Sequence, residues 1–150
     1  MRHRVPGVEA RARTGHLGFL LAKASQRWNQ LLAQAFSERG FPQVRPAYGS
    51  ILLPLFEEDG QRLLTLAGRA RLPKQTMTTL IRQMERDGLI RREPDPADAR
   101  ATRVWLTGTA RAFQRVAEEC LADLDARVAA QLDDQTLTVL RAALREVMDL

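Results

Sequence analysis

The sequence contains little of several residue types, and each shortage excludes a class of protein. A single cysteine, Cys120, excludes an internal disulfide framework, and two lysines among 23 basic residues leave arginine to carry nearly all of the positive charge. Aromatic residues make up 5% of the chain, so the core has to rely on aliphatic side chains. The apolar run at 17–22 is far shorter than the roughly 18 residues that suggest a membrane span. No secretory signal is recognisable, and we expect a cytoplasmic protein without a membrane partner.

The residues that are abundant indicate a globular chain with an uneven charge. Its 150 residues are 45% hydrophobic and 27% charged, with a formal net charge of +5. Segment 69–103 holds nine basic and five acidic residues, whereas 111–150 holds five basic and eight acidic ones. A basic module followed by an acidic helical module is the pattern expected of a DNA-binding surface with a separate association region.

Apolar residues recur at steps of three and four in six segments, which predicts six helices. Four of them are expected at 15–39, 45–58, 63–67 and 73–87, and two more follow the capping residues Thr107 and Asp133. Pro46 suits the first turn of the second helix, whereas Pro54 is expected to kink it. Gly88 is expected to end the fourth helix.

After Gly88 the hydrophobic period changes from helical to strand-like. Segments 89–92 and 102–106 predict two short strands, and the proline- and aspartate-rich segment 93–100 predicts a loop between them. The fold class is therefore expected to be mainly α with a small β-hairpin (α+β). In this fold a winged helix-turn-helix is flanked by N- and C-terminal dimerisation helices.

We expect a flexible basic arm at 1–14 and a single domain at 15–150. Within that domain, 45–107 is expected to form the winged helix-turn-helix lobe, and 15–40 and 108–150 the dimerisation helices. Their apolar stripes are longer than one small lobe needs to cover, which favours a homodimer. A two-fold dimer places two recognition helices about one turn of DNA apart, so the predicted partner is a pseudo-palindromic site in double-stranded DNA.

The helix that opens at Pro73 is the candidate for reading DNA. Its spacing predicts an apolar face that points into the fold and a polar face left for a duplex. The apolar face is Met77, Leu80, Ile81 and Met84. The outward residues are Lys74, Gln75, Thr78 and Arg82, with Thr79 as a further candidate, and the N-terminal turn runs from Pro73 to Thr76. Glutamine pairs with adenine and arginine with guanine, and the helix N-terminus favours phosphate. The alternative is an ordinary solvent-facing helix surface.

The predicted hairpin carries a second candidate contact at its loop. Arg100 lies near the expected tip, where it can enter a minor groove or bind phosphate, and Asp98 can hold its side chain. The alternative is an exposed ion pair between these two residues, worth under ~1 kcal/mol.

Segment 72–90 resembles the recognition helix of the multiple-antibiotic-resistance regulators, the MarR family. The Asp-Pro-Ala-Asp-Ala-Arg sequence at 95–100 and Val-Trp-Leu-Thr at 104–107 resemble that family's wing, and the resemblance extends over about 15–150. It implies that Lys74, Gln75, Thr78 and Thr79 touch bases and phosphates and that Arg100 is the wing-tip arginine. It also implies a homodimer that responds to a small, often phenolic, ligand. This sequence departs from the family pattern at Arg71, Arg82 and Ala99.

Other residues suggest chemistry more weakly. Trp28 and Tyr48 are candidates to line a ligand pocket, with core packing as the alternative. Cys120 lies on an apolar helical stripe, so a packed thiol is favoured over a peroxide sensor. No cluster with metal-ligand spacing, no catalytic constellation and no cofactor motif is recognisable, so we expect neither a metal, a cofactor nor an enzyme.

These patterns predict a sequence-specific transcriptional regulator that binds double-stranded DNA. The resemblance implies a repressor relieved by a small ligand. A winged-helix module that binds other proteins, without specific DNA binding, is the alternative that the sequence leaves open.

Overall fold

The computed structural model describes residues 15–150, which divide at Ala47 and Tyr48 into two compact units. In the described part of the first unit, helix α2 (Leu17–Glu38) confirms the helix predicted at 15–39. His16 caps its start, because the ring Nδ1 accepts a hydrogen bond from the Gly18 N–H at 3.2 Å. Gly40 follows its end at φ +91°, a conformation that favours glycine.

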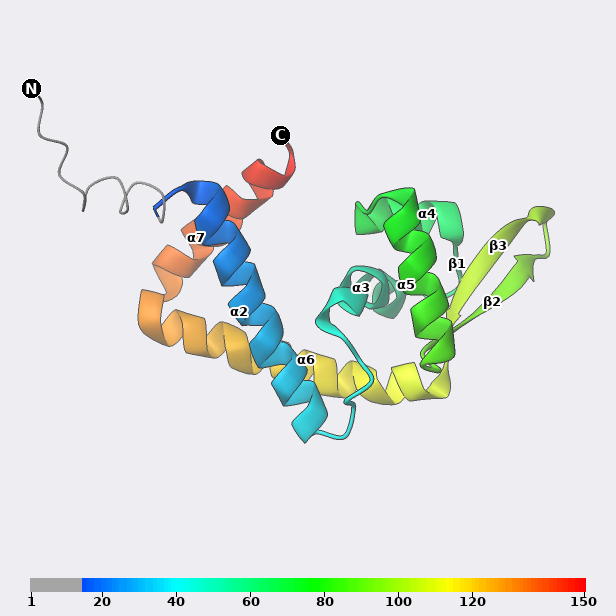
Figure 1. Ribbon diagram of the computed structural model, residues 1–150, viewed down its shortest axis with the longest axis horizontal. Coiled ribbons are helices and arrows are strands. Elements are labelled where there is room, and N and C mark those ends of the chain that lie inside the picture. The colour runs from blue at the N-terminus through cyan, green and yellow to red at the C-terminus, as the bar shows by residue number, and fades with distance from the viewer. Residues whose placement is uncertain (1–14) are drawn as a thin grey trace, which may run out of the picture. The chain divides into compact units, whose positions relative to one another are not determined.

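The second unit contains most of the secondary structure (Figure 1). Its elements are α3 (Gly49–Glu57), β1 (Gln61–Arg62), α4 (Leu63–Ala70), α5 (Lys74–Arg86), β2 (Ile90–Asp95), β3 (Asp98–Leu106), α6 (Gly108–Leu132) and α7 (Asp134–Met148). The helix predicted at 45–58 is corrected at its start, because Pro46–Tyr48 forms a separate 3₁₀ turn before α3. The other helices lie where their hydrophobic period predicted them.

The core of the second unit is aliphatic, as the scarcity of aromatic residues requires. Its fully buried side chains include Ile51, Leu52, Leu55, Leu66, Ile81, Met84, Leu89 and Val104. The predicted inner face of α5 is confirmed, because Met77, Leu80, Ile81 and Met84 are all buried. Burial of each such side chain contributes about 1.5–3 kcal/mol to folding, so α5 is firmly anchored on this side.

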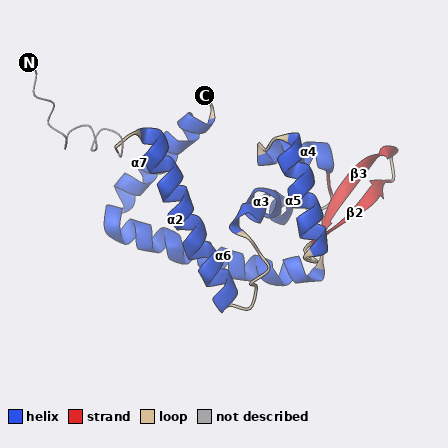
Figure 2. Ribbon diagram, in the orientation of Figure 1, coloured by secondary structure: helices blue, strands red, loops and turns tan. Residues whose placement is uncertain are grey.

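The sheet has one strand more than the sequence predicted. Three antiparallel strands lie in the order β1-β3-β2, with Gln61 paired to Val104 and Ile90 paired to Leu106. Strand β1 escaped prediction because it has only two residues, too few for an alternating pattern. Figure 2 shows the longer pair, β2 and β3, as a hairpin that extends beyond α5.

The loop predicted at 93–100 is wrong. Strand β2 continues through Asp95 and β3 already begins at Asp98, which leaves only a tight turn between them. Pro94 fits because β2 is an edge strand, where a missing N–H donor is tolerated. The Asp95 carboxylate accepts a hydrogen bond from the Ala97 N–H at 2.9 Å, so the aspartate closes the turn instead of opening a loop.

The base of the hairpin packs against the turn before β1. Gly60 has φ +67°, and a Cβ atom added there would lie 2.5 Å from the Trp105 ring. Asp59 Oδ1 accepts hydrogen bonds from the Gly60 and Leu106 backbone N–H groups, both at 2.9 Å. Only glycine satisfies both the backbone conformation and the close indole contact, so this corner fixes where the hairpin leaves the lobe.

The N-cap residues predicted for the two C-terminal helices are both confirmed. Thr107 Oγ1 accepts a hydrogen bond from the Ala110 N–H at the start of α6, and Asp133 Oδ1 accepts one from the Thr136 N–H at 2.7 Å at the start of α7. The backbone hydrogen bond from Thr136 holds the pKa of Asp133 below its usual range.

The two C-terminal helices differ in how their apolar residues are covered. Helix α6 buries Phe113, Ala117, Cys120 and Leu124, whereas α7 buries none of its residues. Across residues 15–150, no helix is both long enough and apolar enough to cross a bilayer.

Candidate nucleic-acid interface

The turn between α4 and α5 sets the position at which α5 begins. Arg71 ends α4 in the left-handed region, with φ 52° and ψ 39°, a conformation that is uncommon for residues other than glycine. Its guanidinium donates hydrogen bonds to the Met148 carbonyl at 3.1 Å and to Asp149 Oδ1 at 3.0 Å. Pro73 then caps α5 with an extended backbone, and its carbonyl accepts the first helical hydrogen bond, from the Met77 N–H.

The polar face predicted for α5 is exposed. Solvent reaches Pro73, Lys74, Gln75, Thr76, Thr78, Thr79 and Arg82. Within residues 15–150, Thr78 is the only one of these whose side chain has a hydrogen-bond or ion-pair partner. The amide, ammonium and guanidinium donors on this face are therefore available to a ligand, and no rearrangement of the fold is needed to expose them.

Thr78 is engaged within its own helix. Its hydroxyl donates to the Lys74 carbonyl at 3.0 Å, one turn earlier. The methyl group is therefore the part of Thr78 left for an apolar contact, and a thymine methyl is the group in the major groove that suits it.

The structure corrects the expected role of Asp98 in the hairpin. Its Oδ1 accepts a hydrogen bond from the backbone N–H of Arg100 at 3.0 Å, and no ion pair joins the two side chains. Asp98 therefore shapes the strand after the turn without engaging the guanidinium of Arg100. That guanidinium is exposed and has no partner in the part of the chain that the structure describes.

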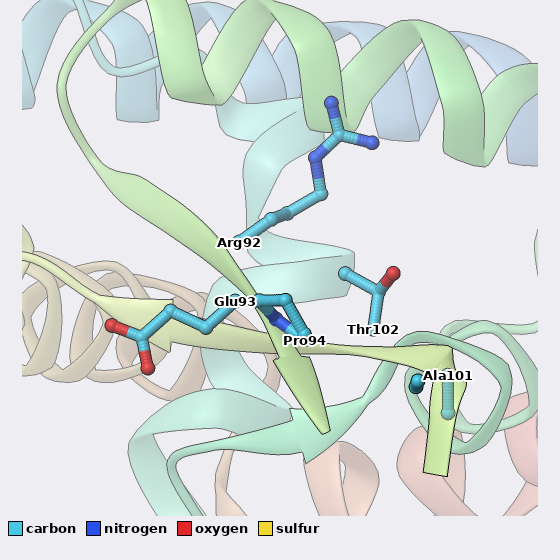
Figure 3. Close-up of a pocket in the computed structure, with 6 residues that line it drawn as sticks. Arg92, Glu93, Pro94, Ala101 and Thr102 are labelled. Carbon is cyan, nitrogen blue, oxygen red and sulfur yellow. The ribbon is translucent and has the colours of Figure 1, made fainter. Parts of the chain in front are cut away.

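An ion pair ties the hairpin to α5. Figure 3 shows Arg92 extending from β2 toward the helix, while the neighbouring Glu93 points the other way. Arg92 Nε lies 2.5 Å from Glu85 Oε1, an ion pair without hydrogen-bond geometry. A cavity of about 250 Å³ opens on this part of the hairpin, lined by Arg92, Glu93, Pro94, Ala99, Ala101 and Thr102.

A buried carboxylate at the hairpin turn was not predicted. Asp95 is 3% exposed and its Oδ2 accepts a hydrogen bond from Arg62 Nε at 2.6 Å, while Arg103 Nε lies 3.3 Å from the same oxygen. The backbone hydrogen bond from Ala97, followed by those from the two arginines, lowers the pKa of Asp95 against the opposing effect of its burial. Asp95 therefore stays ionised and, from strand β2, contacts arginines of both β1 and β3.

Two further cavities flank the start of α4. One of about 400 Å³ is lined by Arg62, Leu63, Leu64, Asp98, Arg100, Ala101 and Thr102. The other, of about 330 Å³, is lined by Leu63, Leu64, Ala67, Leu72, Lys74, Met77, Thr78, Ile81 and Arg92. Leu64 borders both and is 88% exposed, which is unusual for a leucine in a lobe with a dense core.

The two candidate ligand residues have different surroundings. Tyr48 is fully buried in the second unit, and its hydroxyl donates to Asp87 Oδ2 at 2.6 Å, so the core-packing alternative holds for it. Trp28 lies on α2 in the first unit and is half-buried. Cys120 is 1% exposed, which agrees with a packed thiol. Among residues 15–150, no group of three His, Cys, Asp or Glu side chains is arranged to hold a metal ion.

Solved structures resemble this fold over nearly its whole length. The repressor CouR bound to a 23-mer DNA duplex has a TM-score of 0.77 at 23% identity, with 90% of this chain and 94% of that one covered. The PcaV regulator from Streptomyces coelicolor in complex with its natural ligand also has a TM-score of 0.77, at 21% identity, covering 99% of this chain and 98% of that one. At these identities the likeness establishes the fold.

The sequence itself matches a family over the segment that forms this interface. Residues 46–102 match the profile of the MarR family. The transcriptional regulator HosA from Escherichia coli O111:H- is 32% identical over 87 residues, which cover 57% of this chain and 64% of that relative. The matched segment contains the helix-turn-helix, strand β2 and the first part of β3, with the geometry described above. Over this segment the chain is similar to the MarR family, and the match to the family profile covers less than half of the chain.

Proposed function

We propose that the chain is a cytoplasmic, sequence-specific transcriptional regulator that binds double-stranded DNA, acts as a repressor and has no enzymatic activity. One observation carries the proposal: α5 buries its entire apolar face while the polar side chains of its first turns stand exposed and nearly unpartnered. A helix of this kind fits the major groove, where each base pair presents a distinct set of donors, acceptors and methyl groups. The likeness to the repressor CouR, whose structure is bound to a DNA duplex, supports the same proposal. The similarity to the transcriptional regulator HosA supports it as well.

The proposed DNA contacts come from two elements. Lys74, Gln75, Thr78, Thr79 and Arg82 lie along one side of α5 and are assigned to the major groove. Pro73 and Thr76 belong to its N-terminal turn, where free N–H groups favour a phosphate. Arg100 on the hairpin is assigned to the minor groove or the backbone beside it, with Asp98 shaping the strand that carries it.

The regulator is proposed to act as a homodimer on a pseudo-palindromic site. Helix α7 leaves its apolar stripe uncovered, with Leu140, Leu144 and Val147 each more than a third exposed. A second copy of the chain would cover such a stripe and present two recognition helices to two half-sites. A small ligand is proposed to relieve repression, and the resemblance to the MarR family implies that such a ligand is often phenolic. The complex of PcaV with its natural ligand supports a regulator that binds a ligand.

Substitutions on α5 and on the hairpin test the DNA-binding mode. Gln75→Ala should relax the preference at one base position, by about 1–3 kcal/mol, because glutamine reads adenine bidentately. Arg100→Ala should weaken binding about equally for all sequences. Fluorescence anisotropy with the protein's own upstream DNA, with single-base variants of that duplex and with a random duplex measures both effects.

Gln83→Ala is the matched control, because Gln83 lies on the same helix beyond the exposed first turns. It should leave both affinity and base preference unchanged. If the wild-type protein binds its upstream DNA and the random duplex equally weakly, the regulator reading is wrong. A shallow dependence of that binding on salt would favour the protein-interaction module instead.

A further inference from the structure

The cavity of about 400 Å³ at the start of α4 lies outside the proposed reading face of α5. One wall is Arg62, Leu63 and Leu64, and the other is made of Asp98, Arg100, Ala101 and Thr102 from β3. Segments some forty residues apart thus bring two guanidinium groups to one opening. Asp98 and the Asp95 carboxylate beside Arg62 oppose an anion there. With Arg103 next to Asp95, three arginines stand against two aspartates, which leaves one net positive charge.

This cavity adjoins a second one that reaches the proposed reading face, because Leu63 and Leu64 line both. The same two leucines line the neighbouring cavity, whose lining also includes Lys74 and Thr78 of α5. A DNA strand that runs from the first turn of α5 to Arg100 therefore passes the opening beside Arg62. The exposed Leu64 fits this path, because its side chain can pack against deoxyribose while the arginines face phosphate.

Arg62 is prepared for an anionic ligand by its contact with Asp95. Only its Nε is engaged, by the hydrogen bond to Asp95 Oδ2 at 2.6 Å, and its side chain remains 44% exposed. Within residues 15–150 the two terminal nitrogens of the guanidinium have no partner. Those nitrogens carry four N–H donors, which can bind a phosphate in the planar, bidentate manner typical of arginine. Because Asp95 already fixes the side chain, less conformational entropy is lost on binding.

We propose that Arg62, held in place by Asp95, binds a backbone phosphate of the duplex between the segments contacted by α5 and by the hairpin. Arg100 faces the same opening from the other wall. The inference rests on the proposed function, and it assigns a further DNA contact that the sequence did not indicate. The ligand chemistry is a phosphate oxygen pair, which a free anion could also offer, so the test has to separate the two sources.

The experiment measures DNA affinity against salt concentration for Arg62→Gln and Arg103→Gln. Both variants remove one positive charge and one partner of Asp95, but Arg103 does not line the cavity. A phosphate contact contributes about 0.9 to the slope of log affinity against log salt, so a dimer of Arg62→Gln should lose about 2 from that slope. Its affinity at physiological salt should fall about tenfold for every sequence. Arg103→Gln should stay close to wild type in both quantities.

Two further measurements locate the contact. Arg62→Lys should retain the wild-type salt slope while losing part of the affinity, because lysine keeps the charge but not the two-pronged geometry. Duplexes with a neutral methylphosphonate at single backbone positions should show one position per half-site that weakens wild type and leaves Arg62→Gln unaffected.

The outcomes separate this inference from the proposed function. The salt slope of Arg62→Gln can fall as much as that of Arg103→Gln, or neither slope can fall. If wild type still prefers its upstream DNA, either result means that Arg62 makes no phosphate contact, and only this inference is overturned. If wild type shows no such preference, the proposed function fails and this inference fails with it. Calorimetry with inorganic phosphate should show no saturable binding, and saturable binding that Arg62→Gln abolishes would overturn the duplex assignment in favour of a small anion.

Discussion

Helices α5 and α7 have the same kind of amphipathic sequence but opposite surroundings. In α5 the apolar residues are 9% exposed or less and the polar residues face outward. In α7 the apolar residues are the exposed ones: Val139 is 62% exposed, and Leu140, Leu144 and Val147 lie between 37% and 39%. The winged helix-turn-helix lobe thus covers the apolar face of α5, whereas the apolar face of α7 is left exposed.

The difference separates two uses of an amphipathic helix. A helix whose apolar face is already covered can offer only its polar face to a partner, and that favours DNA. A helix whose apolar face is uncovered offers an oily stripe, and exposed apolar stripes of this length mark protein interfaces. The comparison therefore predicts that substitutions on the apolar stripe of α7 affect dimerisation. Substitutions on the buried face of α5 should instead affect the stability of the lobe.

The largest expected effect comes from a charge on the α7 stripe. Leu144→Glu should convert the proposed dimer to a monomer, because a carboxylate cannot be buried unpaired at an apolar interface. DNA affinity should then fall by about 100-fold or more, since two linked half-sites bind with a high effective concentration. Sedimentation velocity and anisotropy measure mass and affinity.

Gln135→Glu on the first turn of α7 is the control for that change, since it adds the same charge at an exposed position outside the stripe. It should leave the mass unaltered. If Leu144→Glu sediments like wild type, the uncovered stripe is not an interface and the comparison with α5 loses its meaning.

Truncating a side chain on the buried face of α5 should have the next largest effect. Met84→Ala should lower the free energy of unfolding by about 2–5 kcal/mol, because Met84 is fully buried and leaves a cavity. Thr79→Ala on the exposed side of the same helix should change it by less than about 0.5 kcal/mol. Urea unfolding measures both, and equal losses would contradict the assignment of the two faces.

The smallest expected effect on the free energy of unfolding tests the packing at the base of the hairpin. Gly60→Ala should destabilise by about 1–3 kcal/mol, because its Cβ would meet the Trp105 ring and its backbone has φ +67°. Gly68→Ala, in the middle of α4 with open space around it, should instead stabilise by about 0.5–1 kcal/mol. A mild effect of Gly60→Ala in urea would mean that this corner is looser than the structure indicates.

The sequence predicted helices better than strands, and the reason is the range of the interactions involved. The helix at 73–87 was predicted with its inner face correct, because the spacing of Met77, Leu80, Ile81 and Met84 is a local pattern. The loop at 93–100 was wrong because its prolines and aspartates were interpreted by composition. In the structure Asp95 is buried by Arg62 and Arg103, and the pairing with Arg62 spans 33 residues.

The candidate site divides in the same way. The exposed polar residues of α5 and Arg100 were named from the sequence, because exposure follows from helical periodicity and the wing from a recognisable motif. Arg62 was missed, because a single arginine ahead of a short helix has no pattern of its own. Asp98 was assigned to the wrong group, since its partner is the backbone N–H of Arg100 and not the guanidinium. Trp28 and Tyr48 belong to different units, and their predicted role in a ligand pocket stays a prediction.

By itself the sequence determined which segments become helices, which face of each is apolar, and where Thr107 and Asp133 begin the last two. These features depend on residues within one or two turns of each other. Tertiary structure alone decided the third strand, the length of the hairpin and the meeting of Arg62 with Asp95. Each of these joins segments that are distant along the chain, and such pairs are selected by the packing of the whole lobe and not by any local preference.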